Sequence, residues 1–135
     1  MMHYTLFGES HGPAVGVLLT DVPPGLPVDE VFIREQLLRR MGQGGLTTAR
    51  QEKEDVHFLS GVYQGRTTGD PLAAVIYNGD VRSTDYDSLK HKPRPSHGDY
   101  TAAVRALGCN DPRGGGPYSG RLTAPLVAAG AMVKA

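Results

Sequence analysis

The spacing of apolar and polar residues predicts a chain of short strands interrupted by three helices. Four apolar runs bounded by glycine, proline or other turn residues are typical of β-strands, and they span 4–7, 14–20, 56–63 and 72–77. A rougher helical spacing favours helices over 30–40, 99–107 and 122–134. Asp29 is a suitable N-cap for the first of these helices. Residues 64–66 are expected to form the turn that follows the third strand.

Glycine and proline cluster between the predicted elements. With 18 glycines and 10 prolines in 135 residues, the chain is expected to form many tight loops rather than a disordered segment. The glycines at 42–45 end the first helix, and a polar connection over 78–95 has a length that is often functional. The triplet Gly114–Gly116 either brings backbone amides up to a phosphate or forms a structural loop.

Length and charge narrow the class of protein. A chain of 135 residues corresponds to one domain with a modest core. Fourteen basic and fourteen acidic side chains cancel, which argues against a broad nucleic-acid surface but leaves room for a local basic pocket. We find neither a run long enough to span a membrane nor a secretion signal. The single Cys109 cannot form an internal disulfide, so a reduced cytoplasmic setting fits best.

Two histidines are the strongest candidates for chemistry. His11 lies in Gly-Glu-Ser-His-Gly after the first strand, and His97 lies in Arg-Pro-Ser-His-Gly-Asp before the second helix. Imidazole can give or take a proton near neutral pH, although either histidine could instead be structural or solvated. A serine nucleophile at Ser10 is disfavoured, because adjacent side chains rarely face each other and the nucleophile-elbow pattern is missing. The spacing of the histidines predicts no metal site.

Five arginines lie close in sequence to these turns or to the glycine triplet: Arg39, Arg40, Arg94, Arg113 and Arg121. Guanidinium groups bind phosphate and carboxylate through paired hydrogen bonds, so the set indicates an anionic substrate. Each arginine could equally be a solvated surface charge. Arg39 and Arg40 also suit the negative end of a helix dipole.

Taken in order, these segments resemble the N-terminal part of the chorismate synthase family over nearly the whole chain. The resemblance rests on short motifs spread from end to end: Phe7-Gly-Glu-Ser-His-Gly12, Val22-Pro-Pro-Gly-Leu-Pro27, Arg39-Arg40, Leu59-Ser-Gly-Val62, Gly65-Arg-Thr-Thr-Gly69, Asn78 with Asp80, Arg82-Ser83, Asp85-Tyr86, Arg94-Pro95 with His97, Asp99-Tyr-Thr101, Asp111, Arg113-Gly-Gly-Gly116 and Val127-Ala-Ala-Gly-Ala131. So many matches in the same order make coincidence implausible.

The resemblance implies an α+β fold, with helices layered against antiparallel sheet, and a lyase of the shikimate pathway of aromatic amino acid biosynthesis. Such an enzyme converts 5-enolpyruvylshikimate 3-phosphate to chorismate by 1,4-elimination of phosphate. It is cytoplasmic and usually a homotetramer. It requires reduced FMN although the reaction has no net redox change. An association with NADP is also implied, without fixing how the FMN is reduced.

Roles for individual residues follow from the same resemblance. His11 and His97 would be catalytic, the first protonating the leaving phosphate and the second protonating or hydrogen-bonding the reduced flavin. Substrate binding would involve Ser10, Arg39, Arg40, Arg94 and Arg121. Cofactor binding would involve Arg40, Arg113 and Ser119. The phosphate and two carboxylates of the substrate would account for the number of arginines.

Departures from the family pattern support a second hypothesis. Where the family usually has arginine and serine before Ser119, this chain has Pro117 and Tyr118, and Leu122 replaces a glutamate. Further departures are Ser96 and Gly98 beside the second histidine and a glycine near Gly45 in place of a basic residue. The family's C-terminal half is absent, so a fragment, a truncated product or a degenerate relative is expected. The chain is then either the N-terminal portion of the lyase or a non-catalytic module that binds anions or a partner chain.

Three further expectations concern the folded chain. His11 and His97 should face one shared cavity. The isolated chain should have little lyase activity, because acid groups without a complete flavin site cannot position the cofactor. The helix over 122–134 has apolar or small residues on most sides, so without the missing half it should self-associate or be poorly ordered.

Overall fold

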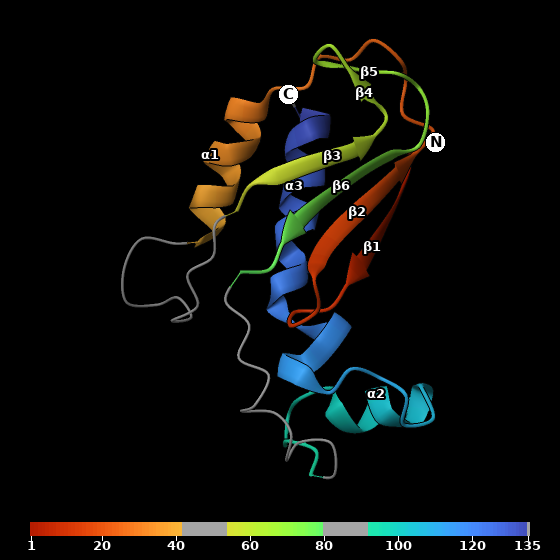
Figure 1. The fold of residues 1–135 in the computed structure, drawn as a ribbon, viewed down its shortest axis with the longest axis vertical. Helices are drawn as coiled ribbons and strands as arrows, with labels where there is room; N and C mark the ends of the chain where they lie inside the picture. Colours follow the sequence, from red (N-terminus) through yellow and green to blue (C-terminus); the bar gives the residue numbers. More distant parts are fainter. Residues whose placement is uncertain (42–53, 80–91, 135) are drawn as a thin grey trace.

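A four-stranded antiparallel sheet forms the centre of the molecule (Figure 1). The computed structural model describes residues 1–41, 54–79 and 92–134. The strands lie in the order β1-β2-β6-β3, and their bounds are His3–Gly8, Ala14–Thr20, Leu72–Tyr77 and Val56–Ser60. A separate hairpin pairs β4 (Val62–Tyr63) with β5 (Arg66–Thr67).

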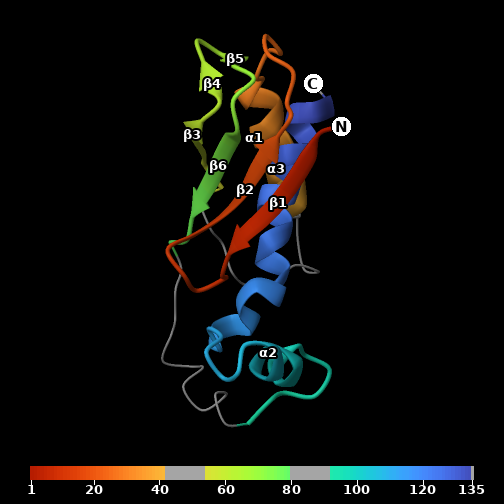
Figure 2. The same cartoon turned by 90° about the vertical axis from the view of Figure 1, so that its right-hand side faces the viewer.

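Two helices cover one face of this sheet, as Figure 2 shows: α1 (Glu30–Met41) and α3 (Thr123–Lys134). The shorter α2 (Asp99–Arg105) lies beyond the end of the sheet that carries the β1–β2 turn. Two 3-10 segments, η2 (Arg113–Tyr118) and η3 (Gly120–Leu122), lead from there into α3. The architecture is therefore α+β with helices layered against an antiparallel sheet, as the resemblance implied.

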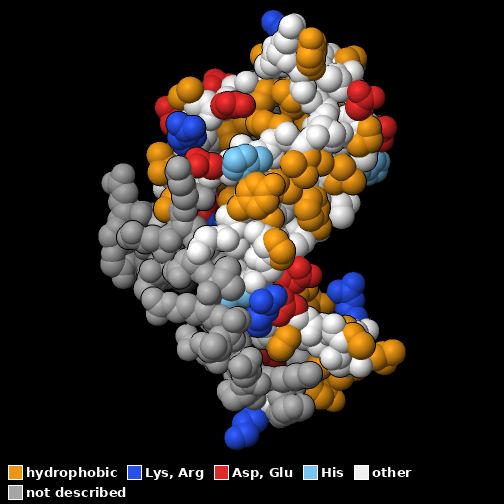
Figure 3. All heavy atoms as spheres, in the orientation of Figure 1, with side chains coloured by type: hydrophobic (Ala, Val, Ile, Leu, Met, Phe, Trp, Pro, Cys, Tyr) orange, Lys and Arg blue, Asp and Glu red, His pale blue; other side chains and the backbone are white. Residues whose placement is uncertain are grey.

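Strand alternation decides which face of the sheet the helices cover. Val15, Val17 and Leu19 of β2 alternate toward the helices and are at most 2% exposed. Burying a side chain of this size contributes roughly 1.5–3 kcal/mol relative to leaving it exposed. On the opposite face Phe7 and Tyr77 remain partly exposed, and Figure 3 shows apolar side chains gathered over the strands.

Alanine lets α3 pack closely against the sheet and α1. Its buried side is made of small residues, Ala124, Ala128, Ala129 and Ala131. Ala128 lies in one core cluster with Ile33 and Leu37 of α1. The expectation that this chain could not cover its last helix is therefore wrong for the alanine side. Leu126 and Val133 on the remaining surface stay exposed.

The predicted elements are confirmed with shifts at their ends. The strand predicted over 56–63 is two strands separated at Gly61, whose φ is +81°. Arg66 lies in β5 and not in the turn before it. The helix predicted over 99–107 ends at Arg105, because Leu107 and Gly108 adopt left-handed backbone conformations. Asp29 caps α1 as expected, since its Oδ1 accepts a hydrogen bond from Phe32 N at 3.0 Å.

The predicted glycine loop at 42–45 and most of the predicted connection over 78–95 lie outside the described residues. Within 1–41, 54–79 and 92–134, we find no helix that is both long and apolar enough to span a membrane.

Candidate functional site

The turn between β1 and β2 holds a buried serine–histidine pair. Ser10 is 0% and His11 is 8% exposed, and Ser10 Oγ lies 2.9 Å from His11 Nδ1. The sequence argument that adjacent side chains would not face each other is therefore wrong here. This turn lies at the end of the sheet that faces η2 and α2 (Figure 1).

The glycine triplet Gly114–Gly116 packs directly against this pair. All three glycines have positive φ, and a Cβ added at Gly114 would overlap the His11 ring and lie 2.8 Å from Ser10 Oγ. Ser10 N donates to Gly116 O at 3.3 Å. The triplet is thus a close-approach loop, so the structural alternative accounts for its glycines.

The Ser10 hydroxyl has two acceptors within reach, His11 Nδ1 at 2.9 Å and Arg113 O at 3.3 Å. When the hydroxyl donates to Arg113 O, it accepts from Nδ1–H of His11, and Nε2 is then the nitrogen at which the neutral ring gains a proton. A histidine held in this way can deliver a proton from Nε2 to a departing anion.

Arg121 ties this turn to a buried carboxylate. Its Nε donates to Asn78 Oδ1 at 3.0 Å, and its Nη1 donates to Glu54 Oε1. Arg121 and Glu54 each have 5% of the side chain exposed. Asn78 in turn donates from Nδ2 to Glu9 O and Gly12 O, at 3.0 and 2.8 Å. The guanidinium is therefore held between β3 and the His11 turn.

Arg40 joins the same carboxylate from the end of α1. Its Nη1 lies 3.3 Å from Glu54 Oε1, and its Nε and Nη2 donate to Thr123 Oγ1 and Gly120 O. Arg39 has a different environment: it is exposed and donates to Gln36 Oε1 within α1 at 3.0 Å. Of this predicted arginine pair, the structure brings Arg40 and not Arg39 into the network around Glu54.

Arg94 and Arg113 each form a bidentate pair with a nearby aspartate. Arg94 donates from Nε and Nη2 to Asp99 at 2.9 and 3.0 Å, and this pairing lowers the pKa of Asp99 to about 2. Arg113 donates to Asp111 at 2.8 and 2.7 Å, which lowers the pKa of the Asp111 carboxyl and raises that of the Arg113 guanidinium. Both arginines keep part of the side chain accessible, 26% for Arg94 and 35% for Arg113.

His97 has a more open setting than His11. Its side chain is exposed, and Nδ1 lies 2.9 Å from Pro95 O. Gly115 follows Gly114, which packs on His11, and it lies near Arg94, three residues before His97. A Cβ added at Gly115 would lie 3.9 Å from Arg94 Nη2 and 3.9 Å from Ser119 Cβ. A single cavity shared by His11 and His97 remains a prediction.

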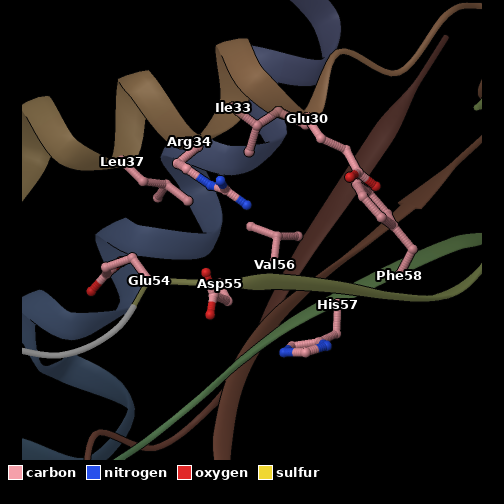
Figure 4. Close-up of a pocket in the computed structure, with 9 residues that line it drawn as sticks. All are labelled: Glu30, Ile33, Arg34, Leu37, Glu54, Asp55, Val56, His57 and Phe58. Carbon is pink, nitrogen blue, oxygen red and sulfur yellow. The ribbon is translucent and has the colours of Figure 1, made fainter.

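A pocket of about 260 Å³ lies between α1 and β3 (Figure 4) and is lined in part by Glu54. Ile33, Leu37 and Val56 are its apolar lining residues, and Arg34 and Asp55 are charged ones. Neither candidate histidine lines it. Among the residues that the structure describes, we find no group of three or more histidine, cysteine or acidic side chains placed to hold a metal ion.

Sequence reasoning missed two residues that organise the site. Glu54 bridges Arg40 and Arg121, and Asn78 was noted only as part of a motif. Neither could be assigned from spacing, because Glu54 is 67 positions and Asn78 is 43 positions from Arg121. A signal was present for Asp99 and Asp111, which lie five and two positions from their arginines.

The fold and site together define a class of α+β proteins in which a sheet turn presents a buried histidine beside several arginines. The chain belongs to the chorismate synthase family, because the family model described as "Chorismate synthase" matches residues 2–135.

Curated relatives named chorismate synthase agree with this assignment. The chain is 54% identical to the protein of Aeropyrum pernix over 130 residues, which are 96% of this chain and 34% of that protein. It is 48% identical to the protein of Pyrococcus abyssi over 134 residues, 99% of this chain and 38% of that protein. A crystal structure of a chorismate synthase matches with a TM-score of 0.58 and 29% identity, covering 98% of this chain and 33% of that one. The chain therefore spans little more than a third of the length of these relatives.

Proposed function

We propose that this chain carries the N-terminal part of the active site of a lyase that converts 5-enolpyruvylshikimate 3-phosphate to chorismate and phosphate. Family membership supports the reaction class. The observation that carries the proposal is the buried Ser10–His11 pair packed on the glycine triplet, with the Asp111–Arg113 pair next along the chain before that triplet. The aromatic amino acid pathway and a cytoplasmic setting belong to the same proposal.

In this 1,4-elimination a C–O bond and a C–H bond break, the existing C=C bond shifts by one position and a second C=C bond forms. The proton of the C–H bond would pass to a base in the complete active site. The phosphate leaves with the electron pair of the C–O bond, so negative charge grows on its oxygens. His11, protonated at Nε2, would donate its proton to that leaving group, while Ser10 holds Nδ1. The buried position strengthens the interaction, because water screens it less there.

The arginines divide into two groups under this proposal. Arg94 and Arg113 are partly accessible, and each can offer donors to a carboxylate or phosphate beside its aspartate. Arg40 and Arg121 would hold the site in position, because their guanidinium groups already donate hydrogen bonds to Glu54, Asn78 and η3. Arg39 would meet substrate only from the exposed surface of α1.

The phosphate group of FMN is proposed to lie near Gly115, where the Arg94 guanidinium and Ser119 would be its neighbours. A Cβ added at Gly115 would lie 3.9 Å from Arg94 Nη2 and from Ser119 Cβ. Arg113 and Ser119 are proposed to hold the cofactor directly and Arg40 to support them from the end of α1, with His97 donating a hydrogen bond to the cofactor. Reduced FMN would supply an electron-rich ring that is not consumed, and an association with NADP belongs to the same proposal.

Two observations favour the alternative of a non-catalytic, anion-binding relative. Leu122, at the place where the family usually has a glutamate, is 8% exposed and belongs to the core. Pro117, at the place of the family's arginine, supplies no cation, and Tyr118 beside it accepts a hydrogen bond from Arg105. The purified chain is accordingly expected to form little or no chorismate with reduced FMN, and formation above a no-protein control would contradict this expectation.

Binding is the sharper test of the proposal. Titrating the chain with inorganic phosphate, and then with the substrate, should shift the ring resonances of His11 in ¹H–¹³C spectra with saturation. His11→Gln should remove this response, whereas the control His3→Gln, which changes an exposed histidine of β1, should keep it. A His11 ring that does not respond to either anion would overturn the proposed role.

A further inference from the structure

We propose that Asn78 is the positioning residue of His11, because its carboxamide clamps the turn that carries the imidazole. Asn78 directly follows β6, and the pairing of Ala14 with Tyr77 brings it beside that turn. Its backbone N donates to Pro13 O at 3.0 Å, and its Nδ2 donates to Glu9 O and Gly12 O. Three hydrogen bonds from one residue therefore reach carbonyls on both sides of His11.

A carboxamide is the side chain that this position requires. One nitrogen supplies two N–H donors for two carbonyls, while the oxygen beside it accepts from Arg121 Nε at 3.0 Å. The opposite amide orientation would put oxygen against carbonyl oxygens and nitrogen against the guanidinium, so the network fixes the orientation. An aspartate of the same shape would keep the contact with Arg121 and lose both donors.

Buried charged side chains hold the Asn78 carboxamide in place. Arg121 is held by Glu54, and Glu54 also receives Arg40 from α1. Within the part of the chain that the structure describes, Glu54 Oε2 is buried and accepts no hydrogen bond. The position of the His11 turn is thereby coupled to α1 and β3 through Asn78. This inference rests on the proposed function only in taking His11 as the proton donor.

The test compares Asn78→Asp with Asn110→Asp in the 135-residue chain. Both variants add one carboxylate, and Asn110 adjoins Asp111, whose charge interacts with that of His11. Asn78→Asp should raise the hydrogen-exchange rates of the backbone amides of residues 12 and 78 about tenfold or more, relative to the backbone amides of β2. It should also change the tautomer signals of the His11 ring nitrogens. Asn110→Asp should leave both readouts unchanged.

Several outcomes would overturn the inference. One is an unchanged His11 tautomer with unchanged exchange in the turn, and another is a uniform increase of exchange across the molecule, which indicates loss of stability alone. If Asn78→Asp does not fold, the same exchange and tautomer measurements are made on Asn78→Ala and compared with the wild type. Through-hydrogen-bond couplings from Asn78 Nδ2 to the Glu9 and Gly12 carbonyls should be present in the wild type, and their absence would refute the clamp. None of these measurements needs lyase activity, so they fail independently of the proposed reaction.

Discussion

Gly114 packs directly against His11, the proposed proton donor. Gly114→Ala would place a methyl group against the His11 ring, whereas Gly115→Ala meets its nearest neighbours only at 3.9 Å. Both positions are left-handed, so each substitution should cost about 1–2 kcal/mol in backbone strain. Gly114→Ala should cost about 1–3 kcal/mol more from overpacking. Urea unfolding measures the difference, and equal losses for the two variants would contradict the packing of His11 on Gly114.

Asp99 provides a pH-dependent test at the same scale. Its pKa is about 2 in the folded chain, below the ordinary value of 3.8, so its ion pair with Arg94 stabilises the fold fully above about pH 4. That contribution should be lost as the pH falls toward 2. Asp99→Asn should lower the free energy of unfolding by about 1 kcal/mol at pH 7 and by almost nothing near pH 2. The exposed Asp70→Asn serves as the control, and a loss that does not depend on pH would refute the pair.

At the scale of elements, α3 tests the close packing of the helical layer. Ala128 is 1% exposed in the core, so Ala128→Leu should destabilise the fold by about 1–3 kcal/mol. Gly130 lies on the same helix with nothing within 4 Å of an added Cβ. Gly130→Ala should therefore stabilise the chain by about 0.8–1 kcal/mol through helix propensity alone. Thermal unfolding checks that Ala128→Leu destabilises the chain and that Gly130→Ala stabilises it. An Ala128→Leu variant as stable as the wild type would show that α3 is loosely packed.

For the whole molecule, the helical layer keeps four large apolar side chains exposed. Leu126 and Val133 of α3 are 40% and 55% exposed, and Val31 and Leu38 of α1 are 68% and 57% exposed. Each pair is seven residues apart, so its members lie on one side of their helix. We predict that the chain self-associates through these side chains, in keeping with the homo-oligomer that the family resemblance implies.

Sedimentation velocity checks this prediction. The double variant Leu126→Glu and Val133→Glu should sediment as a monomer at concentrations where the wild type does not. The matched double variant Val104→Glu and Leu107→Glu, which changes exposed residues in and just after α2, should behave like the wild type. A monomeric wild type at high concentration, with protected amides throughout α3, would contradict the prediction.

The sequence was sufficient for the local features. Strand alternation, the Asp29 cap and the glycines around Gly114 depend on neighbours within a few positions, and the structure confirms the elements that they predicted. Periodicity could not place the C-terminal end of the second helix or divide the strand at Gly61. These details depend on left-handed backbone conformations that the surrounding structure imposes.

By itself, then, the sequence determined the elements and the family and proposed two histidines as candidates for chemistry, because motifs and hydrophobic spacing are written in local order. Only the tertiary structure decided that Arg40 rather than Arg39 joins the network around Glu54, and that Asn78 grips the His11 turn. It also decided that His11 is buried while His97 is exposed. The physical reason is distance along the chain. The hydrogen bonds that set these differences join residues 14 to 103 positions apart, and no local pattern encodes a contact that forms only after the sheet has closed.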